Sequence, residues 1–235
     1  MSILQIIVCD KNYSIEDKVS NILDALFYIK KNKNHSLAFR SGCKSGVCGS
    51  CAIRINGIEK LACKTPIKEN DTIAPLKNSK VVKDLIINLD IQETFLKKSK
   101  AFLEEKSTQV ITQIDEKDID IESNCILCNS CYSSCPVYEY DKKFQGPFAL
   151  NRAFRYINDK KENNKKSKID AIQDNGIWQC TLCGNCNMVC PSYINIKENI
   201  IKLRNLSAQF GYNDPNIQNF GGNFSTDFGF NPNNF

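Results

Sequence analysis

The chain has 235 residues, of which 42% are hydrophobic and 24% are charged, with a formal net charge of +5. This composition indicates a soluble globular protein, and the length fits one large domain or two small ones. Its lysines are spread along the chain, which favours an ordinary solvated surface over a nucleic-acid or acidic-membrane partner. No apolar run reaches the ~20 residues of a membrane-spanning helix. The first residues lack the basic region and cleavage site of a signal peptide.

Cysteine is the outlier in the composition, because the chain holds 13 cysteines and a single histidine, His35. The count alone leaves disulfides, zinc, iron–sulfur clusters and buried thiols open. Most zinc fingers, haem sites and Rieske centres need imidazole ligands, and His35 lies in a polar run that indicates a surface loop. The loop-like cysteine spacings favour metal ligation in a reducing compartment. Cys9 stands apart from the other twelve and is interpreted as a buried structural thiol.

The N-terminal third has the pattern of a mixed α and β structure. The apolar run at residues 3–8 predicts a strand, and Ser20 is the predicted cap of a helix. That helix carries apolar side chains at helical spacing, namely Ile22, Leu23, Leu26 and Ile29. Four more strands are predicted, at residues 52–55, 58–61, 72–74 and 85–87. The dipeptide Asn56-Gly57 is typical of a hairpin turn, and a helix is predicted over residues 95–105.

The first cysteine group lies within this region and is called the N-terminal set. Its members are Cys43, Cys48, Cys51 and Cys63. The opening Cys-x4-Cys-x2-Cys matches the plant-type [2Fe–2S] pattern. Gly42, Gly46 and Gly49 alternate with the ligands, and glycine lets backbone N–H groups approach the sulfur atoms closely. The Asn56-Gly57 hairpin would return Cys63 to the loop that carries the other three cysteines.

Beyond about residue 106 the strand signals stop and short helices between cysteine loops are predicted. One helix begins at Pro147, an acceptable first helical residue, and runs to Ile157. The hydrophilic stretch 160–168 is predicted to be an exposed loop. A last helix covers residues 196–206. The tail from Gly211 has too few aliphatic residues for a core and is either an arm on a partner or disordered.

Two further cysteine groups repeat one pattern, Cys-x2-Cys-x2-Cys-x3-Cys-Pro. They are Cys125, Cys128, Cys131 and Cys135 before Pro136, and Cys180, Cys183, Cys186 and Cys190 before Pro191. This spacing is that of bacterial two-cluster ferredoxins, in which the fourth cysteine ligates the other cluster. The proline redirects the chain, so the fourth thiolate points away from the first three.

The repeat therefore predicts two cubane clusters with exchanged ligands. The middle set is Cys125, Cys128, Cys131 and Cys190, and the far set is Cys135, Cys180, Cys183 and Cys186. The alternative is a pair of zinc ribbons, in which Cys-x2-Cys pairs hold one tetrahedral ion each. Zinc does not require three evenly spaced cysteines followed by Cys-Pro, repeated twice.

Two segments of the sequence resemble one known family. The first is Phe39-Arg40-Ser41-Gly42-Cys43 with Gly49-Ser50-Cys51, Asn56-Gly57 and Leu61-Ala62-Cys63; the second is Gly146-Pro147 with Arg152, Arg155-Tyr156 and Asp159. They resemble the iron–sulfur subunit of succinate dehydrogenase and fumarate reductase, over about residues 3–205. The resemblance implies an α+β chain. It would comprise a β-grasp [2Fe–2S] ferredoxin domain over 1–105, an all-helical two-cluster ferredoxin domain over 106–210, and a tail over 211–235.

Two departures from the common pattern of that family bear on function. Most members have an apolar residue in place of Cys183 and hold a [3Fe–4S] cluster there. A thiolate from Cys183 can hold a fourth iron, so a second [4Fe–4S] cluster is expected, with [3Fe–4S] in its place if Cys183 is not a ligand. Glu139-Tyr140 and Thr181 replace the tryptophans and the histidine of the usual quinone pocket, which argues against direct quinone reduction by this subunit. Both departures resemble the branch with the methylmenaquinol:fumarate reductases and archaeal-type succinate dehydrogenases.

The resemblance also implies partners. One is a flavoprotein with covalently bound FAD, and the other is a membrane-associated subunit, either cysteine-rich or an anchor. The chain would relay electrons between them while peripheral to the cytoplasmic membrane. The cytoplasmic face is favoured, and the periplasmic face stays open because methylmenaquinol enzymes can be exported with their flavoprotein. No nucleic-acid partner and no catalytic residue are expected.

Three functions compete at this point. The first is a relay in a succinate or fumarate oxidoreductase. The second is the same relay for another flavin dehydrogenase, such as a thiol:fumarate or heterodisulfide-reductase-like system. The third is a zinc-stabilised interaction module. An autonomous enzyme is disfavoured, because one histidine in a loop cannot form a Ser/His/Asp set and no Gly-rich phosphate motif is convincing.

Overall fold

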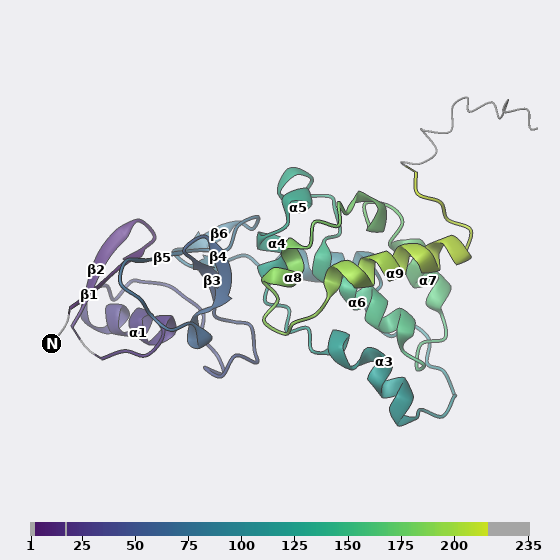
Figure 1. Cartoon of the computed structure of the whole chain (residues 1–235), viewed down its shortest axis with the longest axis horizontal. Coiled ribbons are helices and arrows are strands. Elements are labelled where there is room, and N and C mark those ends of the chain that lie inside the picture. Colours follow the sequence, from purple (N-terminus) through teal and green to yellow (C-terminus); the bar gives the residue numbers. More distant parts are fainter. Residues whose placement is uncertain (1–2, 17, 216–235) are drawn as a thin grey trace, which may run out of the picture.

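The computed structural model describes residues 3–16 and 18–215, which form two neighbouring parts (Figure 1). The N-terminal part holds a sheet with a helix, and the C-terminal part is built from helices and connecting loops. Each part has its own core of buried apolar side chains. The predicted α+β fold is therefore confirmed. Most of the predicted tail, from residue 216 onward, lies outside the described residues.

The N-terminal part is organised around a five-stranded sheet. Its strands are β1 (Leu4–Val8), β2 (Lys11–Ile15), β3 (Ala52–Ile55), β4 (Ile58–Leu61) and β5 (Asp71–Ala74). The order is β2-β1-β5-β3-β4, with β1 and β5 parallel and the other neighbours antiparallel. The predicted hairpin is present between β3 and β4, and its turn residues Asn56 and Gly57 have φ of 52° and 81°. Such left-handed values suit the Asn-Gly pair.

Helix α1 (Ile22–Asn32) packs its predicted apolar face into the core shared with the sheet. The predicted cap is wrong by one residue. The side chain of Asn21 accepts the backbone N–H of Asp24 at 3.0 Å, while the Ser20 hydroxyl donates to the Asp24 carboxylate instead. Both residue types are good N-caps, so residue type alone does not tell which of the two caps the helix. In the structure, Asn21 has the extended backbone of an N-cap.

The segment after the sheet differs from its prediction. A small two-stranded sheet pairs β6 (Val81–Lys83) with β7 (Ile86–Ile87), and α2 (Asp90–Lys98) follows. The strand predicted at 85–87 is therefore present, but the helix predicted over 95–105 is wrong. The helix begins earlier and ends before Lys100, whose φ of 49° is incompatible with a continuing right-handed helix. Strands β2 and β6 were not predicted.

All regular elements of the C-terminal part, from residue 113 to residue 209, are helices. Its helices are α3 (Gln113–Ser123), α4 (Ser130–Ser133), α5 (Pro136–Tyr140), α6 (Pro147–Asn158), α7 (Lys165–Ala171), α8 (Asn185–Met188) and α9 (Ile196–Gln209). Helix α6 lies centrally, with α3 and α9 against it (Figure 1). The helices predicted from Pro147 and over 196–206 are confirmed, and the second continues to Gln209.

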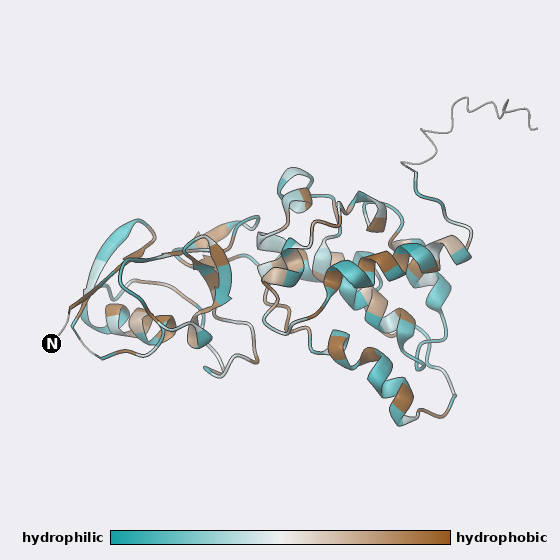
Figure 2. Ribbon diagram, in the orientation of Figure 1, coloured by the Kyte–Doolittle hydropathy of each residue, from teal (hydrophilic) through white to brown (hydrophobic). Residues whose placement is uncertain are grey.

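Hydropathy differs between the central and the outer helices. Helix α6 buries most of its length, from Pro147 to Ile157. Helix α3, in contrast, carries apolar residues in Figure 2 although none of its residues is buried. Ile114 and Ile121 are 72% and 55% exposed. A capping box formed by Thr112 and Asp115 begins α3, so local hydrogen bonds rather than burial define its start.

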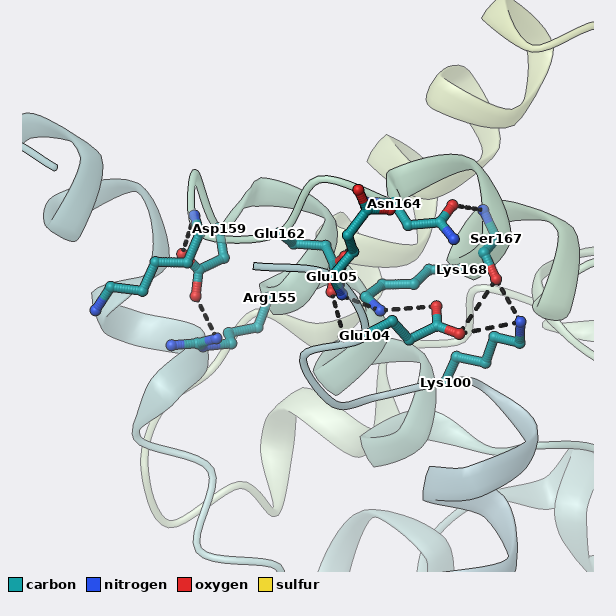
Figure 3. A network of polar contacts seen from close by, with 10 residues as sticks. Lys100, Glu104, Glu105, Arg155, Asp159, Glu162, Asn164, Ser167 and Lys168 are labelled. Atoms are coloured by element: carbon teal, nitrogen blue, oxygen red, sulfur yellow. Dashed lines mark hydrogen bonds and ion pairs between the residues drawn. The ribbon is translucent and has the colours of Figure 1, made fainter. Parts of the chain in front are cut away.

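The prediction that residues 160–168 form an exposed loop is wrong for its second half. Helix α7 begins within this stretch, and the side chain of Lys168 is fully buried. Its ammonium group lies 2.8 Å from the Glu162 carboxylate and 3.1 Å from that of Glu104 (Figure 3). Buried charges are tolerated when they are paired in this way. Glu162 also accepts the backbone N–H groups of Glu104, Glu105 and Asn164, so the network holds the segment after α2 against α7.

Candidate functional site

The N-terminal set lies at the open end of the β3–β4 hairpin and in the loop before it. Cys51 directly precedes Ala52, which pairs with Leu61, and Cys63 follows Leu61 by two residues. The Ala62 N–H donates to the Cys51 carbonyl at 3.0 Å. Both thiols are buried, whereas Cys48 is half-buried and Cys43 is exposed. The hairpin therefore returns Cys63 to the cysteine loop, as the sequence predicted.

Backbone N–H groups in this loop point at the outer thiols. Ser45 and Val47 donate to the Cys43 Sγ at 3.4 and 3.3 Å, and the Cys43 N–H donates to the Cys48 Sγ at 3.4 Å. Hydrogen bonds from Ser45 and then Val47 lower the pKa of Cys43 to about 5. Gly46 and Gly49 support this turn with φ of 88° and 72°, values that other residues adopt with strain.

The middle set surrounds one cavity. Cys125 and Cys128 come from the loop before α4, Cys131 from α4 itself, and Cys190 from a segment nearly sixty residues further along the chain. Apolar side chains complete the lining, among them Phe148 of α6. A cavity lined by four thiols and few other polar groups offers the ligands that an iron–sulfur cluster requires.

The far set surrounds a second cavity in the mirrored way. Here Cys135 comes from the first cysteine segment, Cys180 and Cys183 from the loop before α8, and Cys186 from α8 itself. Three of these thiols are shielded to different degrees, whereas Cys183 is exposed. The structure thus groups the cysteines as the Cys-x3-Cys-Pro spacing predicted. Cys135 lines the far cavity and Cys190 lines the middle cavity.

The two loops share one backbone course. Leu127 and Asn129 have φ of 51° and 66°, and the equivalent Leu182 and Gly184 have φ of 56° and 84°. A left-handed residue after each first and second cysteine bends the chain, so the thiols of one loop face one cavity. The short helices α4 and α8 follow and contact one another. The repeat in sequence is therefore a repeat in structure.

Burial changes the chemistry of these thiols. Desolvation raises the pKa of Cys125 to about 11 and that of Cys186 to about 12, and the pKa of Cys131 lies well above its ordinary value. Thiolates at such positions need a compensating positive charge, which the iron of a cluster supplies. No three or more His, Cys, Asp or Glu side chains among the described residues are placed to hold a metal ion. A cluster, however, distributes its ligands over several irons.

The N-terminal loop touches the middle loop directly. A Cβ atom at Gly49 would lie 2.9 Å from the Cys128 Cβ and 2.9 Å from the Ile126 carbonyl oxygen. The Gln92 side chain of α2 donates to the Leu127 carbonyl at 2.8 Å and so holds the middle loop against α2. No residue larger than glycine fits at position 49 without moving the loops apart.

Sequence reasoning missed the polar residues that clamp the two parts together. The Ser133 hydroxyl donates to Glu59 of β4 at 2.6 Å and accepts the Lys77 N–H at 2.8 Å. The Asn78 side chain donates to the carbonyls of Tyr132 and Ser133. Glu59 is buried although it carries a charge, and it lies on the same face of β4 as the buried Leu61. Its pairing partner lies 74 residues away, so no local signal could have identified it.

His35, Cys9 and the membrane prediction have separate outcomes. His35 is exposed in the loop after α1, as predicted. Cys9 is half-buried rather than buried, in the turn between β1 and β2, and burial followed by the Asp84 charge raises its pKa. None of the helices formed by residues 3–16 and 18–215 combines the length and the apolarity that crossing a membrane requires.

Comparison with known proteins agrees with this geometry. Residues 8–95 match the model of a 2Fe-2S iron-sulfur cluster binding domain, and residues 122–194 match that of a 4Fe-4S dicluster domain. The structure superposes on a chain of the Mycobacterium smegmatis Sdh1 complex with a TM-score of 0.78. The match covers 90% of this chain and 98% of that one at 23% identity, which establishes the fold.

Three relatives define the wider group. The fumarate reductase iron-sulfur subunit of Escherichia coli O157:H7 is 31% identical over 76% of this chain and 78% of its own length. The 8-methylmenaquinol:fumarate reductase iron-sulfur subunit of Wolinella succinogenes is 31% identical over 83% and 66%. A subunit of the fumarate reductase (CoM/CoB) of Methanothermobacter marburgensis is 33% identical over 86% and 41%. This chain thus spans about two fifths of the methanogen proteins it matches, including an iron-sulfur protein of Methanococcus maripaludis at 40%.

The fold and the three cysteine sets define an iron–sulfur protein of the ferredoxin type, with a [2Fe–2S] domain followed by a dicluster domain. Its similarity to the enteric, Wolinella and archaeal subunits covers 76%, 83% and 86% of the chain. The chain belongs to the family of iron–sulfur subunits of succinate dehydrogenase and fumarate reductase.

Proposed function

We propose that this chain relays electrons within a succinate dehydrogenase or fumarate reductase complex and performs no reaction on substrate by itself. The N-terminal set would hold one [2Fe–2S] cluster, and the middle and far sets would each hold one [4Fe–4S] cluster. The contact of Gly49 with the Cys128 loop carries this proposal. It joins the first set to the second, and the exchanged segments join the second to the third, so the sites form one series.

The residues would divide the work in a simple way. The clusters would supply the redox chemistry, and the twelve cysteines would bind them as thiolates. The N–H groups of Ser45 and Val47 would stabilise negative charge at the N-terminal set. The apolar linings, with Phe148 at the middle set, would exclude water.

Two partners follow from the relay. A flavoprotein with covalently bound FAD would exchange electrons with the N-terminal set, and a membrane-associated subunit, cysteine-rich or an anchor, would exchange them with the far set. The enteric and Wolinella relatives are named as iron-sulfur subunits of fumarate reductases, which supports a place for this chain among partner subunits. The complex would be peripheral to the cytoplasmic membrane, on its cytoplasmic face or exported with the flavoprotein.

One observation favours a second candidate. The Methanothermobacter relative is a subunit of a fumarate reductase named for the thiols CoM and CoB, and similarity extends over 86% of this chain. The same relay in a thiol:fumarate system is therefore the alternative function. The two are separated by the electron donor that the assembled complex accepts, a quinol or a dithiol.

The cofactor assignment is tested by metal analysis of protein purified without oxygen. We expect about ten irons per chain, two at the N-terminal set and four at each of the others. Equimolar acid-labile sulfide should accompany the iron. Stoichiometric zinc with little iron would contradict the assignment.

The relay is tested by activity. The purified chain should accept electrons from dithionite yet neither reduce fumarate nor oxidise succinate. Addition of the flavoprotein should restore activity with artificial dyes, and coupling to the membrane donor should also require the third subunit. Fumarate reduction by this chain alone, free of flavin, would overturn the proposal.

Substitution of Gly49 by alanine tests the contact between the first two sets. The added Cβ would press on Cys128 and Ile126 at 2.9 Å, so the loops must separate. We expect slower electron transfer from the N-terminal set onward, measured by rapid-mixing reduction through the flavoprotein. The free energy of unfolding should also fall, by more than the ~1–2 kcal/mol cost of a left-handed alanine.

Gly57→Ala is the matched control for this variant. Gly57 has a similar φ of 81°, but a Cβ there meets no atom within 4 Å. It should lose stability through backbone strain alone and keep the rate of electron transfer. Equal rates in the two variants would show that the contact at Gly49 does not serve the relay.

A further inference from the structure

Asn129 occupies an unusual place in the loop of the middle set. It follows Cys128, and its backbone carbonyl accepts the N–H groups of Tyr132 and Ser133 and so begins α4. The residue is 2% exposed and lines the same cavity as the four cysteines of that set. The main chain of Asn129 therefore starts α4, and its side chain lines the cavity of the four thiols.

The side-chain amide of Asn129 has no hydrogen-bond partner among the described residues. Both Nδ2 and Oδ1 are buried and unpaired. An asparagine that precedes a helix ordinarily accepts a backbone N–H of the first turn, but this one caps nothing. Buried amides without partners are unfavourable and rare. The cavity must therefore hold a group that satisfies the amide when the protein is complete.

The chemistry of the cavity selects which amide atom is used. The cluster proposed for the middle set would present sulfur atoms that carry negative charge, and such atoms accept hydrogen bonds. The Nδ2–H group is a donor, whereas Oδ1 would be repelled. Hydrogen bonds to cluster sulfur stabilise the more negative, reduced state and raise the reduction potential.

The internal repeat supplies a comparison within the same molecule. Gly184 stands in the far loop where Asn129 stands in the middle loop, directly after Cys183 and Cys128 respectively. Both have left-handed backbones, with φ of 66° at Asn129 and 84° at Gly184. The backbone requirement is therefore met by glycine in one loop. The amide side chain is therefore present in the middle loop and absent from the far loop at the same position of the repeat.

We propose that the Nδ2–H group of Asn129 donates a hydrogen bond to the sulfur atoms at the middle set and raises the reduction potential of that cluster above the value its thiolates alone would set. This inference rests on the proposed cofactor assignment. Asn129 would then set the difference in reduction potential between two clusters that have the same four-cysteine ligand set.

The decisive variant is Asn129→Gly, which keeps the left-handed backbone and removes only the amide. EPR-monitored potentiometry of the complete protein should show the middle cluster harder to reduce, with the oxidised-to-reduced ratio at fixed potential raised about tenfold, as for a hydrogen bond to a charged group. Tenfold corresponds to ~59 mV for one electron. The far cluster should not change. Asn70→Gly, an exposed left-handed asparagine in the N-terminal part, should change neither.

The mirrored variant adds the amide where it is absent. A Cβ at Gly184 meets only the flexible end of Lys197, at 3.7 Å, and asparagine tolerates a left-handed backbone better than most residues. Gly184→Asn should make the far cluster easier to reduce, again by about tenfold in the ratio, and leave the middle cluster unchanged.

A spectroscopic measurement on the unmodified protein tests the proposed hydrogen bond even if Asn129→Gly loses its cluster. In unmodified protein made with asparagine labelled with nitrogen-15 at the side-chain amide, pulsed EPR of the reduced middle cluster should show coupling to that nitrogen. Absence of this coupling, or unchanged potentials in Asn129→Gly at full iron content, overturns the role of Asn129 alone. Unmodified protein without iron would instead overturn the cofactor assignment, so the two failures are distinguishable.

Discussion

Replacement of Cys183 by alanine is expected to remove one iron from the far set and leave the others in place. Four thiols line that cavity, and Cys183 is the exposed one. A cubane with cysteine ligands uses one thiolate for each iron, so three remaining thiolates should hold a three-iron cluster. Iron should fall by about one per chain. The EPR signal of an oxidised three-iron cluster, absent from the unmodified protein, should appear.

Cys9→Ala is the matched control for this substitution. Cys9 is the one cysteine outside the three sets, and it lies in the turn between β1 and β2. It should retain all of its iron and show no new signal. If the unmodified protein already gives the three-iron signal at full occupancy, Cys183 is not a ligand and the far cluster is [3Fe–4S].

Replacement of Lys168 by methionine should have the largest effect on stability. The lysine side chain is fully buried between the carboxylates of Glu162 and Glu104, at 2.8 and 3.1 Å (Figure 3). Methionine fills much of the same volume but leaves Glu162, itself buried, without its counter-charge. Removal of one partner from a buried ion pair costs about 3–5 kcal/mol. Chemical denaturation should show a loss of this size.

Lys166→Met provides the same substitution two residues earlier in α7. Lys166 pairs with Asp170 on the surface, and the two side chains are 62% and 42% exposed. Exposed pairs contribute about 0–1 kcal/mol, so this variant should be nearly as stable as the unmodified chain. A loss for Lys168→Met no greater than that for Lys166→Met would refute the structural role of the network. Adding Glu162→Gln to Lys168→Met should recover part of the loss.

The same network has a pH signature with a definite sign. Burial acts to raise the pKa values of Glu104 and Glu162 and is the largest single influence on each. The hydrogen bonds that each carboxylate accepts, from Lys168 and from its other donors, together outweigh burial, and both pKa values are lowered in the folded chain. Carboxyls with lowered folded pKa values stabilise the chain above their unfolded pKa, about 4.3. That contribution disappears as pH falls through the lowered values. In Lys168→Met the contribution of Lys168 to the lowered pKa values is lost while burial stays, so both carboxyls protonate at higher pH than in the unmodified chain. Acidification should therefore lessen the stability deficit of this variant.

The network and the cysteine sets illustrate two kinds of predictability. Cysteine spacing is local information, because three thiols at steps of three residues face one cavity whenever the loop bends as at Leu127 and Leu182. The Asn56-Gly57 turn is local in the same sense. Lys168, by contrast, lies in a stretch whose composition indicates solvent exposure. Its burial depends on Glu104, 64 residues away, and periodicity carries no record of such a pairing.

The sequence by itself determined the class of this protein. Three cysteine sets, their Cys-Pro ends and the segments around them predicted two ferredoxin domains of the succinate dehydrogenase and fumarate reductase family, and the fold and the relatives confirm that prediction. Ligation of each cluster remains a prediction. Only the tertiary structure decided that Gly49 touches the Cys128 loop and that Ser133 joins Glu59. It also decided that the Asn129 amide is buried without a partner beside four thiols. These contacts join segments that are distant in the chain, and their formation depends on how the two cores pack together.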